Sequence, residues 1–130
     1  MAEREPPTEG MLRVRLGLHD THYADGLIPA ATIMRLFADC QSEVSIRMDG
    51  VDGYMAAYEK SEFLKPVYAG DYLEIRAKLI SRGNRSRRFA MEALRCLATK
   101  ELGGGLSGGT VFDPPELVAR ATLMCVKPRD

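Results

Sequence analysis

Several features are scarce in this sequence, and each scarcity excludes a class of protein. The 130 residues carry 18 lysine and arginine side chains against 18 aspartate and glutamate side chains, so no net charge attracts nucleic acid. No apolar run approaches the length that spans a membrane. The segment from Ala2 to Gly10 is charged, contains proline and lacks the apolar core of a signal peptide. We therefore expect a soluble, cytoplasmic protein that binds neither nucleic acid nor membranes.

Cysteine is scarce as well. The chain has 3 cysteines, at Cys40, Cys96 and Cys125, far apart and each within an apolar segment. This spacing does not match that of a metal site, so we expect no bound metal. The three side chains are instead expected to behave as small buried hydrophobic residues in a reducing compartment.

What is present suffices for one domain. The length is typical of a single domain, and 45% of the residues are hydrophobic and 28% charged, close to the globular average. A chain of this size buries roughly two-thirds of its unfolded surface, enough for a core without disulfides. Residues 1–10 are expected to form a disordered leader, and residues 11–130 a single domain.

Hydrophobic periodicity predicts one helix among several strands. Apolar side chains alternate with polar ones from residue 12, which indicates a half-buried strand. Apolar residues at helical spacing predict one long helix over 29–48, beginning at Pro29 and ending before Gly50. The glycine-rich stretch 102–115, with five glycines and two prolines, is expected to be a long, flexible hairpin loop. Further strands are predicted over 54–65, 73–79, 86–99 and 117–126.

The order β-α-β-β-β-β predicts an α+β fold. An antiparallel sheet that accompanies a single helix can bury that helix only by wrapping around it, which is the arrangement called the hotdog fold. The outer face of such a sheet would also need cover. We therefore expect a homodimer or a larger homo-oligomer.

The segment Glu62–Asp71 joins two predicted strands. Pro66 cannot donate to a strand ladder, so it ends a strand or lies at an edge or bulge, and Gly70 with Asp71 is expected to reverse the chain. Glu62 stands directly before Phe63 and Leu64. Partial desolvation there would raise the pKa of its carboxyl and make it a usable base. The alternative is a strand residue that points to water.

Two further groups of ionisable residues precede or lie on the helix. The loop His19–Tyr23 contains both histidines, with Asp20 between them and a phenol beside them. It is either a cluster of proton carriers at a substrate or a turn capped by Asp20 with solvated histidines. Asp39 and Glu43 share a helix face. They either pair with Arg35 and Arg47 on an exposed face or look into a site at a subunit interface.

The turn Arg82–Arg88 is strongly basic. Its arginines and its polar residues suggest a phosphate partner, because guanidinium groups bind phosphate with two parallel hydrogen bonds. The alternative is a solvated basic turn.

Taken together, these motifs resemble those of 3-aminobutyryl-CoA ammonia-lyases. These are hotdog-fold enzymes of anaerobic lysine degradation, related to acyl-CoA thioesterases, and the resemblance covers residues 11–128. It implies reversible loss of ammonia from a β-aminoacyl-CoA to give an enoyl-CoA such as crotonyl-CoA, with no cofactor because coenzyme A is part of the substrate. The matching motifs are His19-Asp20-x-His22-Tyr23, Leu36-Phe37-x-Asp39-x-x-x-Glu43, Ala57-Tyr58, the segment Glu62–Asp71 and Gly83-Asn84-x-Ser86-Arg87.

Roles for these residues follow from the reaction. Glu62 or Asp39 is the expected base for the α-proton. Backbone N–H groups over 28–31 would meet the developing enolate charge. Asp20 with His22 or Tyr23 would bind the β-ammonium group and supply a proton. His19, Tyr23 and Glu43 would contact the substrate, and Arg85, Ser86, Arg87 and Arg88 would hold the phosphates of coenzyme A.

Three other functions compete with this one. An acyl-CoA thioesterase would use Asp39 to activate water, although the Gly-His-x-Asn pattern of one thioesterase group is absent. A hydratase of this fold would need an Asp-x-x-x-x-His dyad, whereas Asp20 is followed by His22. A non-catalytic module that binds CoA thioesters would not need clustered ionisable groups.

Overall fold

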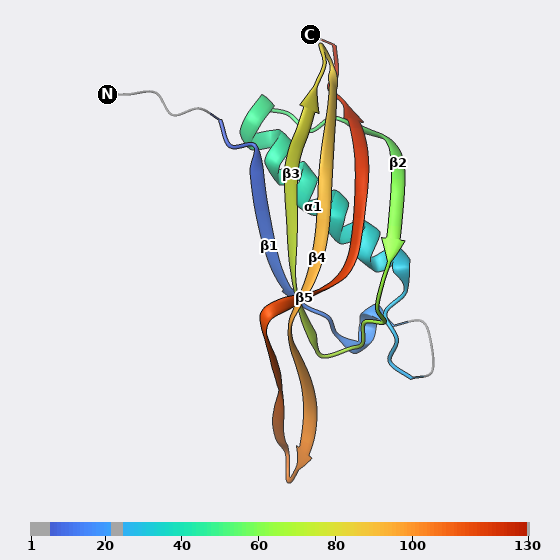
Figure 1. Cartoon of the computed structure of the whole chain (residues 1–130), viewed down its shortest axis with the longest axis vertical. Coiled ribbons are helices and arrows are strands. Elements are labelled where there is room, and N and C mark those ends of the chain that lie inside the picture. Colours follow the sequence, from blue (N-terminus) through green and yellow to red (C-terminus); the bar gives the residue numbers. More distant parts are fainter. Residues whose placement is uncertain (1–5, 22–24, 130) are drawn as a thin grey trace, which may run out of the picture.

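The structure is one antiparallel sheet with a helix across one of its faces (Figure 1). It is a computed structural model that describes residues 6–21 and 25–129. The sheet has five strands in the order β1-β3-β4-β5-β2. This confirms the predicted α+β architecture. The elements are β1 (Glu9–Arg15), the short 3-10 helix η1 (Leu18–Asp20), α1 (Ala30–Asp49), β2 (Tyr54–Phe63), β3 (Asp71–Arg82), β4 (Ser86–Gly103) and β5 (Leu106–Val126).

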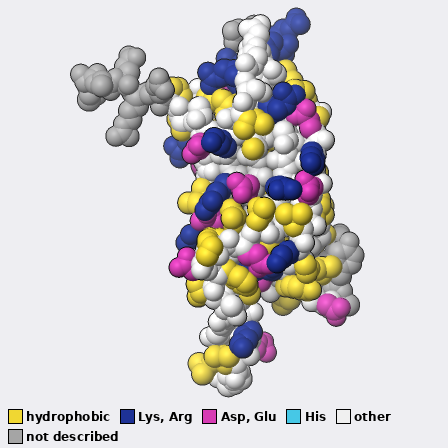
Figure 2. All heavy atoms as spheres, viewed as in Figure 1, with side chains coloured by type: hydrophobic (Ala, Val, Ile, Leu, Met, Phe, Trp, Pro, Cys, Tyr) yellow, Lys and Arg dark blue, Asp and Glu magenta, His cyan; other side chains and the backbone are white. Residues whose placement is uncertain are grey.

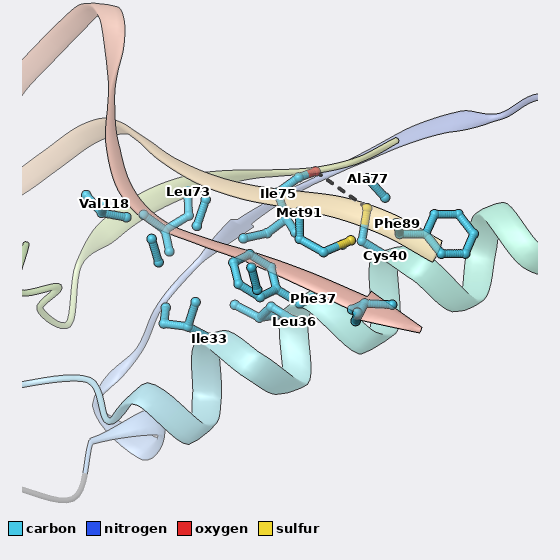
Figure 3. Close-up of a cluster of buried hydrophobic side chains, with 14 of the residues drawn as sticks. Ile33, Leu36, Phe37, Cys40, Leu73, Ile75, Ala77, Phe89, Met91 and Val118 are labelled. Carbon is cyan, nitrogen blue, oxygen red and sulfur yellow. Dashed lines mark hydrogen bonds between the residues drawn. The ribbon is translucent and has the colours of Figure 1, made fainter. Parts of the chain in front are cut away.

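The core lies between α1 and the inner face of the sheet. Figure 3 shows Phe37 and Leu36 of the helix pointing at side chains of three strands, with Phe37 fully buried. Each such apolar side chain contributes about 1.5–3 kcal/mol through burial. On β2, the hydroxyl of Tyr58 donates to the carbonyl of Met34 at 2.6 Å, which ties this edge strand to the helix. Burial raises the pKa of Tyr58. The period-3.6 pattern therefore correctly predicted both the helix and its buried face.

The ends of α1 follow the sequence signals closely. Pro29 is the N-cap residue, one position before the predicted first turn, and no side chain caps this end. Gly50 ends the helix with φ 78° and donates its N–H to the carbonyl of Ile46 at 2.8 Å. A left-handed residue at this position favours glycine.

The outer face of the sheet, which faces away from α1, carries charges of both signs (Figure 2). On it the Glu74 carboxylate accepts a hydrogen bond from Arg13 at 3.0 Å and also pairs with Arg76. The hydrogen bond from Arg13, followed by those from Arg76, lowers the pKa of Glu74. Strand alternation accounts for the arrangement, because every second side chain of each strand points away from the helix.

Two expectations about chain segments are wrong. The stretch 102–115 is not a loop: β4 runs to Gly103 and β5 starts at Leu106, and the two strands project beyond the sheet as a paired arm (Figure 1). The glycines 103–105 have positive φ and form its tip. Strand pairing between β4 and β5 outweighs the flexibility of the remaining glycines. In addition, β1 begins at Glu9, inside the expected leader, and a Cβ on Gly10 would lie 2.5 Å from Cγ2 of Val44.

The segment between β2 and β3 does not reverse the chain into a neighbouring strand. β4 and β5 lie between these two strands, so the segment crosses from one side of the sheet to the other. The backbone N–H groups of Leu64 and Lys65 donate to the carbonyl of Val118 on the way. Gly70 then adopts φ 94° close to Thr99, where a Cβ would lie 2.3 Å from Oγ1. The turn residues were recognised from the sequence, but the connection that they make was not.

Candidate active site

Part of the predicted site gathers beside the N-terminal end of α1. The carboxylate of Asp20 accepts the N–H of Gly17 at 2.9 Å, and Nε2 of His19 lies 3.5 Å from the same oxygen. Nη2 of Arg35 lies 3.8 Å from Oδ1 of Asp20, while Nη1 of Arg35 donates to Asp39 at 3.1 Å. Arg35 therefore links the two carboxylates. Sequence spacing predicted the pair between Arg35 and Asp39, but only the fold brings Asp20 to them.

A polar cavity of about 310 Å³ opens at this cluster. It is lined by η1 and by the first turns of α1. Its contents are a carboxylate, an imidazole and a guanidinium within a few ångströms of one another, which is a set able to bind an ammonium group and exchange protons. His22 and Tyr23 lie outside the described residues. The lining residues are His19, Asp20, Thr21, Pro29, Ala31, Thr32 and Arg35.

A second, apolar cavity of about 250 Å³ lies on the other side of the helix start. The N–H groups of Ala30 and Ala31 donate to no described residue, as expected in the first turn of a helix. Of the other predicted donors, Ile28 already donates to Val67 at 2.8 Å, and Pro29 has no N–H. Only Ala30 and Ala31 fit the expected oxyanion role. The cavity is lined by Leu27, Ile28, Ala30, Ile33, Phe63, Leu64, Lys65, Pro66, Val67, Val118 and Ala119.

Glu62 does not belong to either cavity. Phe63 lines the apolar cavity, and strand alternation places Glu62 on the opposite face of β2. There it accepts hydrogen bonds from Nε and Nη2 of Arg120 at 3.2 and 3.3 Å, with Lys60 at 3.4 Å. The hydrogen bond from Arg120 is the largest reason why the pKa of Glu62 is lowered. The expected rise in its pKa is wrong, because the neighbouring apolar residues do not share its face.

The exposed face of α1 carries the ion pairs that spacing allowed. Arg47 lies 3.8 Å from Glu43, and both side chains are well exposed. Asp39 is 51% exposed beside Arg35. In one copy of the chain, Glu43 is therefore a surface residue, whereas Asp39 is connected through Arg35 to the cavity at Asp20.

The basic turn is used differently from the prediction. Arg87 is buried and makes four hydrogen bonds, two of them to the carboxylate of Asp49 at 3.0 and 3.1 Å and two to the carbonyls of Gly83 and Ser86. These use four of the five N–H groups of a guanidinium. Arg88 pairs with Glu59 at 2.5 and 2.9 Å. Neither guanidinium is available to phosphate as predicted, because each already faces a carboxylate.

One buried network was missed by the sequence reading. Arg95 donates to Asp71 at 2.8 Å and to the carbonyl of Pro66 at 2.9 Å, and it also reaches Glu116 at 3.2 Å. Lys65 pairs with Glu116 at 2.8 Å. The network holds the segment that lines the apolar cavity. No spacing rule could find it, because its members come from three separate parts of the chain.

Several simple alternatives are not supported within residues 6–21 and 25–129. No group of three or more His, Cys, Asp or Glu side chains is arranged there to hold a metal. No helix of this part is long and apolar enough to cross a membrane. Cys40 and Cys125 are free and buried, as predicted, whereas Cys96 is only partly buried. Desolvation raises the pKa of the Cys40 and Cys125 thiols to about 11, so neither is a reactive thiolate.

Comparison with known proteins agrees with this arrangement. No family model matches the sequence. The chain is 36% identical over 122 residues to a 3-aminobutyryl-CoA ammonia lyase of Acetoanaerobium sticklandii, covering 94% of this chain and 96% of that protein. The structure of β-alanyl-CoA:ammonia lyase from Clostridium propionicum superposes with a TM-score of 0.84 at 23% identity, covering 98% of this chain and 94% of that one. A hexameric hotdog-fold thioesterase of Campylobacter jejuni superposes with a TM-score of 0.69 at 19% identity, covering 91% and 81%.

The wrapped helix and the cavities at its N-terminal end define a hotdog-fold protein, as predicted. The two structural similarities establish the fold. The sequence similarity over nearly the whole chain establishes more: the protein belongs to the 3-aminobutyryl-CoA ammonia lyase family.

Proposed function

We propose that the protein catalyses reversible elimination of ammonia from a β-aminoacyl-CoA, such as 3-aminobutyryl-CoA, to give an enoyl-CoA such as crotonyl-CoA. The observation that carries this proposal is the 36% identity to a 3-aminobutyryl-CoA ammonia lyase over 94% of the chain. The linked carboxylates at the N-terminal end of α1 support it, because the reaction needs both a base and an anionic site for ammonium. Coenzyme A is part of the substrate, and no other cofactor is proposed.

The reaction is divided among the residues as follows. Asp39 removes the proton α to the thioester, and the electron pair moves toward the thioester oxygen. The N–H groups of Ala30 and Ala31, at the positive end of the helix dipole, stabilise the enolate. The pair then forms the double bond, and the β-ammonium group leaves as ammonia with the electrons of the C–N bond. Asp20 binds the ammonium group before it leaves, and Arg35 keeps both carboxylates ionised.

The remaining predicted residues keep secondary places in this scheme. His19 contacts the substrate at the polar cavity, which it lines. His22 and Tyr23, in the same sequence motif, supply the proton that keeps the amine protonated. Glu62 is the less favoured base, since its carboxylate is held by Arg120 on the outer face of the sheet. Glu43 contacts substrate only if a second copy covers the exposed face of the helix.

A second copy of the chain is part of the proposal. Asp39 is half exposed in one copy, whereas a base needs a site from which bulk water is excluded. We propose a homodimer or larger homo-oligomer in which a neighbouring copy covers this face of α1. The structural neighbour from Campylobacter jejuni is described as a hexamer. The free, buried cysteines are consistent with a reducing, cytoplasmic location.

One assay tests the function against its rivals. The protein is mixed with crotonyl-CoA, with and without ammonium, while enoyl absorbance and free thiol are followed together. Ammonium-dependent loss of absorbance without thiol release is the expected result. Thiol release would instead identify a thioesterase, the second candidate, which the similarity to a hotdog-fold thioesterase favours. Loss of absorbance without ammonium would identify a hydratase, and no change with any acyl chain would refute an enzymatic role.

A further inference from the structure

A basic cavity of about 380 Å³ lies at the end of the sheet where β3 turns into β4. It is lined by Asn84 and Arg85 of the turn and by Lys127, Pro128 and Arg129 of the C-terminal segment. The turn and the segment hold each other in place: the N–H of Lys127 donates to the carbonyl of Arg85 at 2.7 Å, and Nε of Arg85 donates to the carbonyl of Lys127 at 3.0 Å. The cavity walls are therefore fixed relative to each other.

The cations of this cavity differ from most others in the chain. Arg13, Arg35, Arg47, Arg76, Arg87, Arg88, Arg95 and Arg120 each pair with a carboxylate. Over residues 6–21 and 25–129, no carboxylate lies within 4.0 Å of the charged groups of Arg85, Lys127 or Arg129. Figure 2 shows lysine and arginine side chains collected at this end of the molecule. A protein without net charge has thus left three neighbouring cations without an acidic partner.

The floor of the cavity explains why Arg87 does not fill this role. Arg87 uses its donors on Asp49 and on the carbonyls of Gly83 and Ser86, so it supports the turn from inside. Arg85, by contrast, spends only Nε on the backbone and leaves both terminal nitrogens without a hydrogen bond to a described residue. A guanidinium with two free terminal nitrogens suits a phosphate group.

We propose that Arg85, Lys127 and Arg129 bind a phosphate group of the coenzyme A part of the substrate. This inference rests on the proposed function, and it assigns the phosphate subsite to the C-terminal segment, in place of Arg87 and Arg88. Three cations around a cavity of this size match the charge of a phosphate dianion or a diphosphate. Because these contacts are far from the reacting atoms, they contribute to affinity for substrate and not to the chemical step.

The test is calorimetric binding of free coenzyme A to the intact protein. The double variant Lys127→Ala/Arg129→Ala should raise the Kd for coenzyme A by about tenfold, the loss of roughly one charge-assisted contact. Its affinity should also depend less steeply on salt than that of the wild type, since fewer cations pair with phosphate. In turnover of crotonyl-CoA with ammonium, KM should rise while kcat stays unchanged. Arg129→Lys, which keeps the charge, should recover most of the affinity of Arg129→Ala.

Lys100→Ala is the matched control, because it removes an exposed cation on the β4–β5 arm. It should change neither the Kd nor its salt dependence. Equal Kd values for the double variant and the wild type would overturn the inference, even if turnover established the lyase. Salt-dependent binding of coenzyme A that the double variant loses, without turnover of any enoyl-CoA, would support the subsite and refute the proposed function. An unchanged unfolding midpoint shows that the variants are folded.

Discussion

Arg87 separates the structural reading of the basic turn from the sequence reading most sharply. Its side chain is 8% exposed and that of Asp49 is 10% exposed, and two hydrogen bonds of 3.0 and 3.1 Å join them. Removal of one partner from a buried pair costs about 3–5 kcal/mol, because the other charge is left without compensation. Arg87→Ala also frees the carbonyls of Gly83 and Ser86, but these lie at a turn that water can reach. We therefore expect a loss of about 3 kcal/mol.

Denaturant unfolding at one fixed protomer concentration measures this loss. In a thermal scan it corresponds to a fall of roughly 10 °C in Tm for a domain of this length. Arg88→Ala is the control, because it breaks a more exposed pair with Glu59 and should cost about 1 kcal/mol or less. The double variant Arg87→Met/Asp49→Leu should recover most of the stability. A stable Arg87→Ala variant that binds coenzyme A poorly would refute this reasoning and restore Arg87 to the phosphate site.

Three further predictions follow from the site, the turn and the outer face. Asp39→Asn should lower kcat by at least about a hundredfold, within the range of general base catalysis, whereas Glu62→Gln should leave it within about twofold; the reverse order in the crotonyl-CoA assay would make Glu62 the base. Gly70→Ala should cost more than 2 kcal/mol of unfolding free energy, because both φ 94° and the close approach oppose it, whereas Gly50→Ala, with φ 78° and open space, should cost about 1 kcal/mol; equal costs would remove the steric argument. The pKa of Glu74 is lowered in the folded state, so its contribution is fully present above its ordinary pKa of 4.5 and is lost as the pH falls through the folded value; Glu74→Gln should therefore flatten the decline in unfolding free energy below pH 4.5, and an unchanged slope would contradict the assignment.

The elements of this protein were predictable because they depend on local periodicity. The helix face that includes Phe37, the end of the helix at Gly50 and the alternation along β3 are properties of residues a few positions apart. A sheet with a single helix has one way to bury it, so the fold class followed as well. The β4–β5 arm was not predictable from its glycines, because its strands are stabilised by pairing with each other over many residues.

The candidate site could be predicted only where its chemistry lies within one motif. The His19–Asp20 motif was found in the sequence, but its connection to Asp39 through Arg35 depends on how η1 packs against the helix. Likewise, the basic turn was recognised, while the arginine that is used up there and the C-terminal cations that join it were not. Arg87 and its partner Asp49 are 38 residues apart.

The sequence by itself determined the elements, the fold class and, through its motifs, the family. The tertiary structure decided which charges are free and which are spent. Glu62 is the clearest case: its apolar neighbours suggested a desolvated base, and the fold instead placed it opposite Arg120, 58 positions away, on the far face of the sheet. The physical reason is that the pKa of a carboxyl depends on the charges and solvent within a few ångströms, and those are set by contacts that no local pattern records.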